Sequence, residues 1–198
     1  MGDEKHWLKP DEVEAMRDAA HEGRHPQRDD AIITLLYDTG LRRNELAHVN
    51  REMFALEDGL LRLPTSVHKD YPNDITPPPV TFELDRDSSL RTVATLREFL
   101  EARVDDDPSL VPSQKAGRMT GKGINDVVQR AARRAGVRPY CFSGRGRPED
   151  ISAHTLRHSV AWRMLRIEGG NTLYDVRNRL RHASLLTTER EYDHFETI

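Results

Sequence analysis

The longest aliphatic stretch of the chain, Ala31-Ile32-Ile33 followed by Thr34-Leu35-Leu36, is the feature that most constrains its fold. It is far shorter than the about 20 apolar residues that a membrane-spanning helix needs. The stretch instead predicts a buried helix over about residues 29–38, with Gly40 suited to the chain reversal that follows. A chain built around this helix is expected to be globular, with no membrane partner.

Further segments carry apolar residues at helical spacing. They predict helices from Pro10 to near Gly23, from a cap at Asp87 or Ser88 to about Val104, from about Ile124 to Gly136, from about His154 to Glu168, around Leu173 to Leu180, and in a last short stretch before Tyr192. Leu60, Leu61 and Leu63, and then Ile75, flank a polar segment and predict a small β-hairpin, which Pro77-Pro78-Pro79 limits. The Gly-, Pro- and Arg-rich residues 138–149 predict a loop. The expected fold class is mainly α with a small antiparallel β-sheet (α+β).

Composition predicts a globular protein, and we expect it to lie in the cytoplasm. Its 198 residues suffice for one domain or at most two small ones. The charged start, Met1 to Lys5, precedes no apolar signal region, and the one cysteine, Cys141, cannot form an intrachain disulfide. The net charge of −3 does not by itself indicate a nucleic-acid partner. Arginines nevertheless cluster locally, as at Arg42-Arg43 and between residues 177 and 181.

One group of polar residues predicts chemistry on a phosphate. Arg157 follows His154 by three residues, so on a helix the two side chains share a face. A guanidinium can bind two phosphate oxygens, and an imidazole can exchange a proton at neutral pH. Arg42 would supply a second positive charge, and a tyrosine, Tyr192, would supply a phenolic oxygen for attack.

A metal site is a weaker interpretation of the same residues. His154 and His158 are four residues apart, but no glutamate follows the first histidine as in the zinc-protease pattern. His158 is expected to be a packed, hydrogen-bonded supporting residue. We therefore expect no metal and no cofactor.

The order of these motifs resembles the tyrosine recombinases, the phage integrase family. Its catalytic domain carries a T-G-L-R-x-x-E-L segment, an H-x-L-R-H box, a later L-G-H and a nucleophilic tyrosine about ten residues beyond. The chain has Thr39-Gly40-Leu41-Arg42 with Glu45-Leu46, then His154-Thr155-Leu156-Arg157-His158, then Leu180-Arg181-His182, then Tyr192. The resemblance extends from about Leu8 to His194.

The resemblance implies a role for each matched residue. Arg42 and Arg157 would bind the scissile phosphate, His154 would accept a proton, and His182 would donate a hydrogen bond to the phosphate. Tyr192 would attack to give a 3′-phosphotyrosyl link and a free 5′-hydroxyl, so that strands rejoin without ATP or metal. Glu45 would support the segment behind Arg42. The family also uses a hairpin lysine as general acid, and Lys69 lies in the matching segment.

The chain departs from the family pattern in ways that shape the remaining expectations. Arg181 stands where the family usually has glycine, and Pro77-Pro78-Pro79 replaces a usually basic strand. The sequence begins where the catalytic domain normally begins, so we expect residues 1–198 to form a single catalytic domain, with the N-terminal core-binding domain absent from this chain. The expected partner is double-stranded DNA, bound weakly by a monomer, with a tetramer on DNA if the protein is fully active.

Two functions remain open at this point. The first is a site-specific DNA recombinase or integrase catalytic domain. The alternative is a DNA-binding or regulatory module of the same fold with little or no recombination activity.

Overall fold

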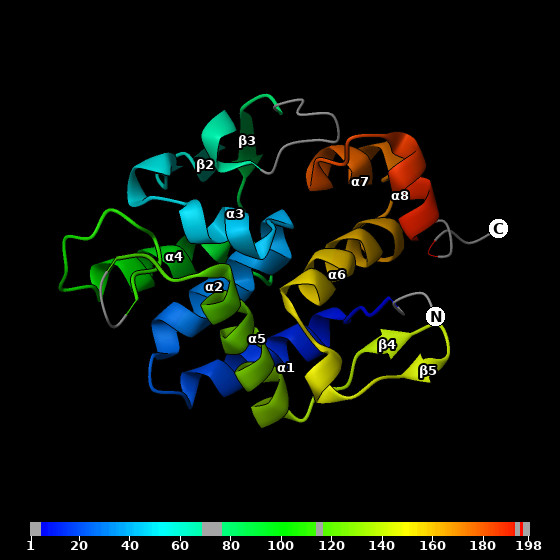
Figure 1. The fold of residues 1–198 in the computed structure, drawn as a ribbon, viewed down its shortest axis with the longest axis horizontal. Coiled ribbons are helices and arrows are strands. Elements are labelled where there is room, and N and C mark those ends of the chain that lie inside the picture. The colour runs from blue at the N-terminus through cyan, green and yellow to red at the C-terminus, as the bar shows by residue number, and fades with distance from the viewer. Residues whose placement is uncertain (1–4, 69–76, 114–116, 193–194, 196–198) are drawn as a thin grey trace.

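The computed structural model describes residues 5–68, 77–113, 117–192 and 195. Within them the chain is mainly helical, with two small antiparallel sheets, which confirms the expected fold class (Figure 1). The α-helices are α1 (Pro10–His21), α2 (Pro26–Thr39), α3 (Arg43–His48), α4 (Thr92–Glu101), α5 (Gly121–Ala135), α6 (Ala153–Arg166), α7 (Leu173–Leu180) and α8 (Leu185–Tyr192). The strands are β1 (Phe54–Ala55), β2 (Leu60–Leu63), β3 (Val80–Glu83), β4 (Tyr140–Cys141) and β5 (Gly144–Arg145).

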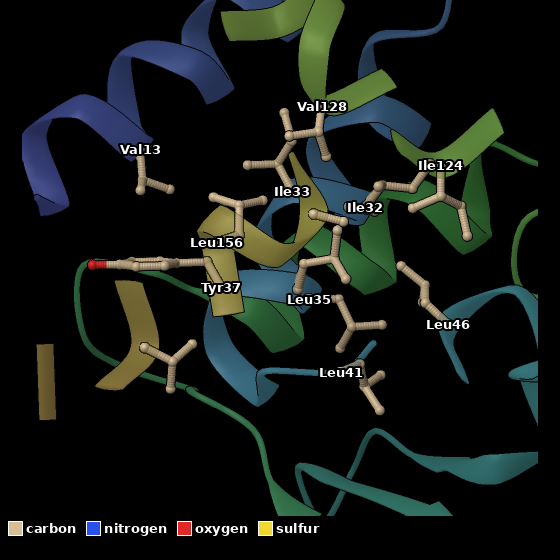
Figure 2. Close-up of a cluster of buried hydrophobic side chains, with 14 of the residues drawn as sticks. Val13, Ile32, Ile33, Leu35, Tyr37, Leu41, Leu46, Ile124, Val128 and Leu156 are labelled. Atoms are coloured by element: carbon tan, nitrogen blue, oxygen red, sulfur yellow. The ribbon is translucent and has the colours of Figure 1, made fainter. Parts of the chain in front are cut away.

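Helix α2 is the centre of the core. All its residues from Asp29 to Thr39 are buried, and α1, α4, α5 and α6 pack against it. Figure 2 shows Ile32, Ile33 and Leu35 of α2 among side chains from α1, α3, α5 and α6. Fully burying one such aliphatic side chain stabilises the fold by about 1.5–3 kcal/mol. The helix predicted from the longest aliphatic stretch therefore organises the other helices around it.

Helix ends follow local capping chemistry. The Thr120 hydroxyl accepts a hydrogen bond from the Gly123 amide at the start of α5, and Gly136 ends that helix in the left-handed conformation at φ 64°. At the start of α7, the Thr172 amide donates to the Asp175 carboxylate over 2.8 Å. The capping residues thus fix where α5 and α7 begin.

The start of α4 differs from the prediction. Asp87 or Ser88 was expected to cap it, but the helix begins at Thr92, preceded by Arg91 in the left-handed conformation at φ 49°. The Asp85 carboxylate instead accepts a hydrogen bond from the Arg91 amide over 2.9 Å. This interaction closes a turn over residues 85–91, so the helix begins later in the chain than predicted. At its other end, α4 stops at Glu101, before the fully exposed Val104.

The β elements also differ in part. The three-stranded sheet has the order β1-β2-β3, and β2 pairs with β3 antiparallel, with Leu61 opposite Phe82. The strand that pairs with β2 therefore follows the three prolines, which leaves its ladder amides free to pair. Ile75 and the rest of residues 69–76 lie outside the described residues.

The segment expected to be a loop carries a short ladder. Within residues 138–149, Tyr140 pairs with Arg145 and Cys141 with Gly144. The strands β4 and β5 are two residues each and lie near the N-terminal segment, where Trp7 forms an isolated bridge with Tyr140 (Figure 1). The Tyr140 ring contacts two cations, with the Arg145 guanidinium 3.9 Å and the Lys9 Nζ 4.6 Å from its centroid. These long-range contacts are not visible in the local sequence pattern.

Candidate active site

Two arginines are brought together by the turn after α2 and by α6. Gly40 ends α2 at φ 66°, and the chain then leads through Arg42 into α3. Arg157 on α6 is 1% exposed, and its guanidinium donates to the backbone carbonyls of Gly40 and Leu180. A buried charge requires such partners. Arg157 therefore joins α2, α6 and α7 at one point.

Arg157 has partners but no directly bonded carboxylate among the described residues. Burial lowers its pKa to about 9, and the positive charges of Arg42 and Arg181 act in the same direction. Because that pKa is still above 7, the guanidinium is charged at neutral pH. An anion beside it would relieve the repulsion among these arginines.

Glu45 balances part of this positive charge. Its carboxylate accepts from the Arg42 amide over 2.8 Å, from Arg42 Nη1 over 2.9 Å and from Arg181 Nη2 over 2.5 Å. Burial would raise the pKa of Glu45, but the charges of Arg181 and Arg42 lower it to about 2. Glu45 is therefore ionised and fixes both arginines.

Arg42, Glu45 and Arg157 line a cavity of about 600 Å³. His154, in the first turn of α6, is exposed at its edge, and its ring lies 4.4 Å from that of His158. The cavity is formed by Arg42, Arg43, Asn44, Glu45, His48, Ser66, Val67, His68, Asn125, Ser152, Ala153, His154 and Arg157. Its charged lining residues are three arginines and one glutamate, and this net positive charge suits an anionic ligand.

Tyr192 lies beside this cavity but does not line it. Its side chain, at the end of α8, is 1% exposed, and its hydroxyl lies 3.0 Å from His158 Nδ1. The His182 ring stacks on the Tyr192 ring at 5.8 Å, and His182 Nδ1 lies 2.9 Å from the Thr188 hydroxyl. To react with a group held in the cavity, Tyr192 must leave this packed position.

Burial sets the protonation of the three rings. It raises the pKa of Tyr192 above its ordinary value, with a smaller opposing effect from Arg157. It lowers the pKa of His158 to about 2 and that of His182 to about 3, and nearby positive charges add to both shifts. At neutral pH the phenol keeps its proton, and both imidazoles are neutral.

The structure places most of the predicted residues close together. Arg42, Glu45, His154 and Arg157 line the cavity, whereas His158, His182 and Tyr192 form a buried group next to it. Lys69 lies outside the described residues. The sequence pattern did not indicate the contact between His158 and Tyr192, because the two residues are 34 positions apart.

Several cavity residues were not predicted. His48 and Asn44 come from α3, Asn125 from α5, and His68 from the segment before Lys69. His68 is partly buried, and its Nε2 has no hydrogen-bond partner among the described residues. Its position next to Lys69 was the only available signal. The others come from helices whose packing the sequence does not specify.

Within the described ranges, no group of three His, Cys, Asp or Glu side chains is arranged to hold a metal ion. Over those same ranges, none of the helices has the length and apolar character needed to cross a membrane.

Within this mainly helical fold, two arginines and a histidine line one cavity, and a buried tyrosine lies next to it. The model of the phage integrase family matches residues 6–197, and the chain belongs to that family.

Curated relatives agree with this assignment. The chain is 32% identical over 185 residues to tyrosine recombinase XerC of Bifidobacterium longum (strain DJO10A), which covers 90% of this chain and 46% of the relative. It is 30% identical over 166 residues to tyrosine recombinase XerA of Pyrococcus furiosus, with 82% of this chain and 49% of the relative covered. The chain thus spans about half the length of the curated relatives it matches.

Solved structures share the fold. A crystal structure of XerA recombinase matches with a TM-score of 0.72 at 21% identity, over 93% of this chain and 59% of that one. A lambda integrase dimer bound to a COC′ core site matches with a TM-score of 0.68 at 18% identity, over 96% of this chain and 49% of that one.

Proposed function

We propose that this chain is the catalytic part of a site-specific DNA recombinase, which cleaves and rejoins DNA strands through a 3′-phosphotyrosyl intermediate. The observation that carries the proposal is the cavity in which Arg42 and Arg157 meet, with Tyr192 packed beside it. The relatives named tyrosine recombinase, and the solved recombinase bound to its core site, support the same function.

The two arginines would hold the scissile phosphate. The Gly40 and Leu180 carbonyls fix the Arg157 guanidinium, and Glu45 fixes that of Arg42. Positive charge that is already in place stabilises the additional negative charge of a pentavalent phosphate without reorganisation. This preorganisation is the main contribution we assign to the pair.

Tyr192 would be the nucleophile. Its oxygen attacks phosphorus, the bond from phosphorus to the 5′-oxygen breaks, and the strand remains attached through a 3′-phosphotyrosyl bond. The phenol needs a base because burial raises its pKa and it is protonated at neutral pH. His154, exposed at the cavity edge, would accept that proton, and His182 would donate a hydrogen bond to the phosphate once Tyr192 has moved.

Lys69 would complete the chemistry as general acid. The departing 5′-oxygen needs a proton, and Lys69 follows His68, which lines the cavity. The reverse step, attack by a 5′-hydroxyl on the phosphotyrosyl bond, would rejoin the strand with no ATP or metal. His158 would hold the Tyr192 hydroxyl in the resting position.

The ligand of this site would be double-stranded DNA. We propose residues 1–198 as a single catalytic domain that is monomeric alone, acts in the cytoplasm and assembles as a tetramer on DNA when fully active. With few phosphate contacts, its own affinity for DNA should be weak and should fall with salt.

The test is a covalent adduct with nicked duplex DNA carrying the host attachment sequence. We expect a protein–DNA band that resists SDS, and we expect Tyr192→Phe to abolish it. Tyr174→Phe is the matched control, because Tyr174 is exposed on α7. A shifted band in native gels with no adduct from the wild type would favour the alternative, a DNA-binding module without recombination activity.

A further inference from the structure

Arg181 occupies a backbone conformation that does not favour arginine. It ends α7 at φ 55° and ψ 50°, in the left-handed region. Glycine enters this region without a penalty from a Cβ atom, whereas other residues meet a clash with the following carbonyl. A strained residue of this kind persists where its side chain makes a compensating interaction.

The compensating interaction is a buried ion pair. Arg181 Nη2 donates to Glu45 Oε2 over 2.5 Å, and the two side chains are 3% and 1% exposed. The Arg181 guanidinium also lies 4.9 Å from the centroid of the Phe82 ring on β3. One side chain therefore connects the turn before His182 to the start of α3 and to the three-stranded sheet.

Glu45 is shared between two arginines with different surroundings. Arg42 is partly exposed to the cavity, with 30% of its side chain accessible, and within the described ranges its guanidinium donates a hydrogen bond only to Glu45. Arg181 is buried and does not line the cavity. The Glu45 carboxylate thus accepts hydrogen bonds from two guanidiniums. That of Arg181 lies inside the protein, and that of Arg42 lies on the side of the cavity.

This sharing determines how much of Arg42 is available to an anion. With Arg181 present, Glu45 does not have to be neutralised by Arg42 alone, and Arg42, Arg157 and Arg181 outnumber the one carboxylate by two positive charges. Without Arg181, Glu45 would be a buried charge with Arg42 as its only bonded cation, and the attraction would draw Arg42 away from the cavity.

We propose that Arg181 is a positioning residue that acts through Glu45 to hold Arg42 in the geometry required for binding the scissile phosphate. The inference rests on the proposed function, since it assigns Arg181 a place in the same reaction. Arg181 does not touch the phosphate. It sets the position and net charge of the group that does.

The first test measures adduct formation on the nicked duplex at saturating DNA. We expect Arg181→Gly to react about 10- to 100-fold more slowly than wild type, because displacing a phosphate-binding group by about 1 Å has an effect of that order. Because the DNA is saturating, a change in DNA affinity does not enter this rate. Arg181→Lys, which keeps a charge near Glu45, should recover part of the rate. A rate for Arg181→Gly within about twofold of wild type would overturn the inference. So would a decrease in rate that is fully explained by a smaller fraction of folded protein.

Arg91→Gly is the matched control. Arg91 is also left-handed, at φ 49°, but it is exposed, and no ion pair of its side chain is found in the described ranges. We expect the rate of Arg91→Gly to equal that of wild type. This control separates the effect of placing glycine at a left-handed position from the effect of losing the Arg181 side chain. If Arg181→Gly does not fold, Arg181→Gln provides the same comparison, because it keeps the wild-type backbone cost and loses only the charge.

The second test needs no DNA and therefore distinguishes failure of this inference from failure of the proposed function. The Nε–H signal of Arg42 is followed by ¹H–¹⁵N NMR and assigned by its absence in Arg42→Lys. We expect it to shift or broaden in Arg181→Gly and to return toward its wild-type position in Arg181→Lys. An unchanged signal would overturn the positioning role. If the wild type forms no adduct but the Arg42 signal shifts in Arg181→Gly as expected, the result would contradict the proposed recombinase function and leave the positioning role of Arg181 intact.

Discussion

Gly40 is the residue at which backbone conformation and site chemistry meet. Its φ of 66° turns the chain from α2 into the segment that carries Arg42, and its carbonyl accepts a hydrogen bond from Arg157. A Cβ at this position would lie 2.4 Å from the Leu180 Cδ2 atom. Both the turn and the space therefore require glycine.

Gly40→Ala should lower the free energy of unfolding by more than the about 1–2 kcal/mol that a left-handed alanine costs, because the Leu180 contact adds to it. Urea unfolding measures the change. Gly136→Ala is the control, since Gly136 has φ 64° and nothing within 4 Å of its Cβ position. Equal losses in the two variants would contradict the close packing at Gly40.

Buried histidines make the fold sensitive to acid. A histidine whose pKa falls on folding binds its proton more readily in the unfolded chain, so protonation below about pH 6.5 favours unfolding. Burial lowers the pKa of His158 to about 2 and that of His182 to about 3. Each should therefore remove about 1.4 kcal/mol of stability per pH unit once the pH is well below 6.5.

The measurement is urea unfolding at pH 7.0, 6.0 and 5.0. Stability should decline through this window, and His182→Asn should make the decline shallower. A variant as sensitive to acid as wild type would show that His182 is not held neutral in the folded state.

At the scale of elements, sequence patterns predicted helices better than strands. The aliphatic stretch located α2, and Gly136 located the end of α5, because helix signals are local. The strand that pairs with β2 lies after the three prolines, at Val80–Glu83, where the sequence pattern had not indicated one. Strand pairing joins distant residues, and local periodicity does not determine it.

The site likewise combines residues that sequence motifs predict with contacts that only the fold determines. The motif order brought Arg42, His154 and Arg157 to attention, and the structure places all three on one cavity. It could not reveal that Arg181 reaches Glu45 across 136 positions, since only packing sets that contact.

Helix α8 should be the first part of the site to open. Its Leu185 and Leu186 are exposed, whereas α6 is buried along most of its length. The Lys5 Nζ donates to the Arg190 carbonyl over 3.0 Å and pairs with Glu191 over the same distance, which ties the N-terminal segment to α8. Because Tyr192 must leave its packed position to react, this element has to be easy to open.

Hydrogen–deuterium exchange tests this order. Amides of α8 should exchange faster than those of α6, and Lys5→Ala should raise exchange in α8 by up to about fivefold, since partly exposed ion pairs contribute about 0.2–1 kcal/mol. The α6 amides serve as the internal control. Equal protection of α6 and α8, or an unchanged α8 in Lys5→Ala, would contradict the proposed opening.

At the scale of the whole molecule, net charge and local charge have opposite signs. The chain carries a net charge of −3, yet arginines surround the cavity. Each phosphate contact releases counterions from DNA, so the salt dependence of binding reports the number of contacts. The slope of log affinity against log salt concentration changes by about 0.9 for each contact. We assign one such contact to Arg42.

Arg42→Gln should therefore reduce the slope of log affinity against log salt by about 0.9, measured by fluorescence anisotropy with labelled duplex DNA. Arg28→Gln is the control. Arg28 lies near the opposite end of α2 from Gly40 and pairs with Asp29 over 2.7 Å. An unchanged slope in Arg42→Gln would remove Arg42 from the phosphate contacts.

The proposed reaction requires a covalent bond between Tyr192 and DNA, and mass spectrometry of the digested adduct detects that bond. The nicked duplex is incubated with the protein, nuclease trims the DNA, and peptides carrying a nucleotide are sequenced. We predict the modification on Tyr192. A nucleotide on any of the other tyrosines, Tyr37, Tyr71, Tyr140 or Tyr174, or an adduct that persists in Tyr192→Phe, would contradict the account.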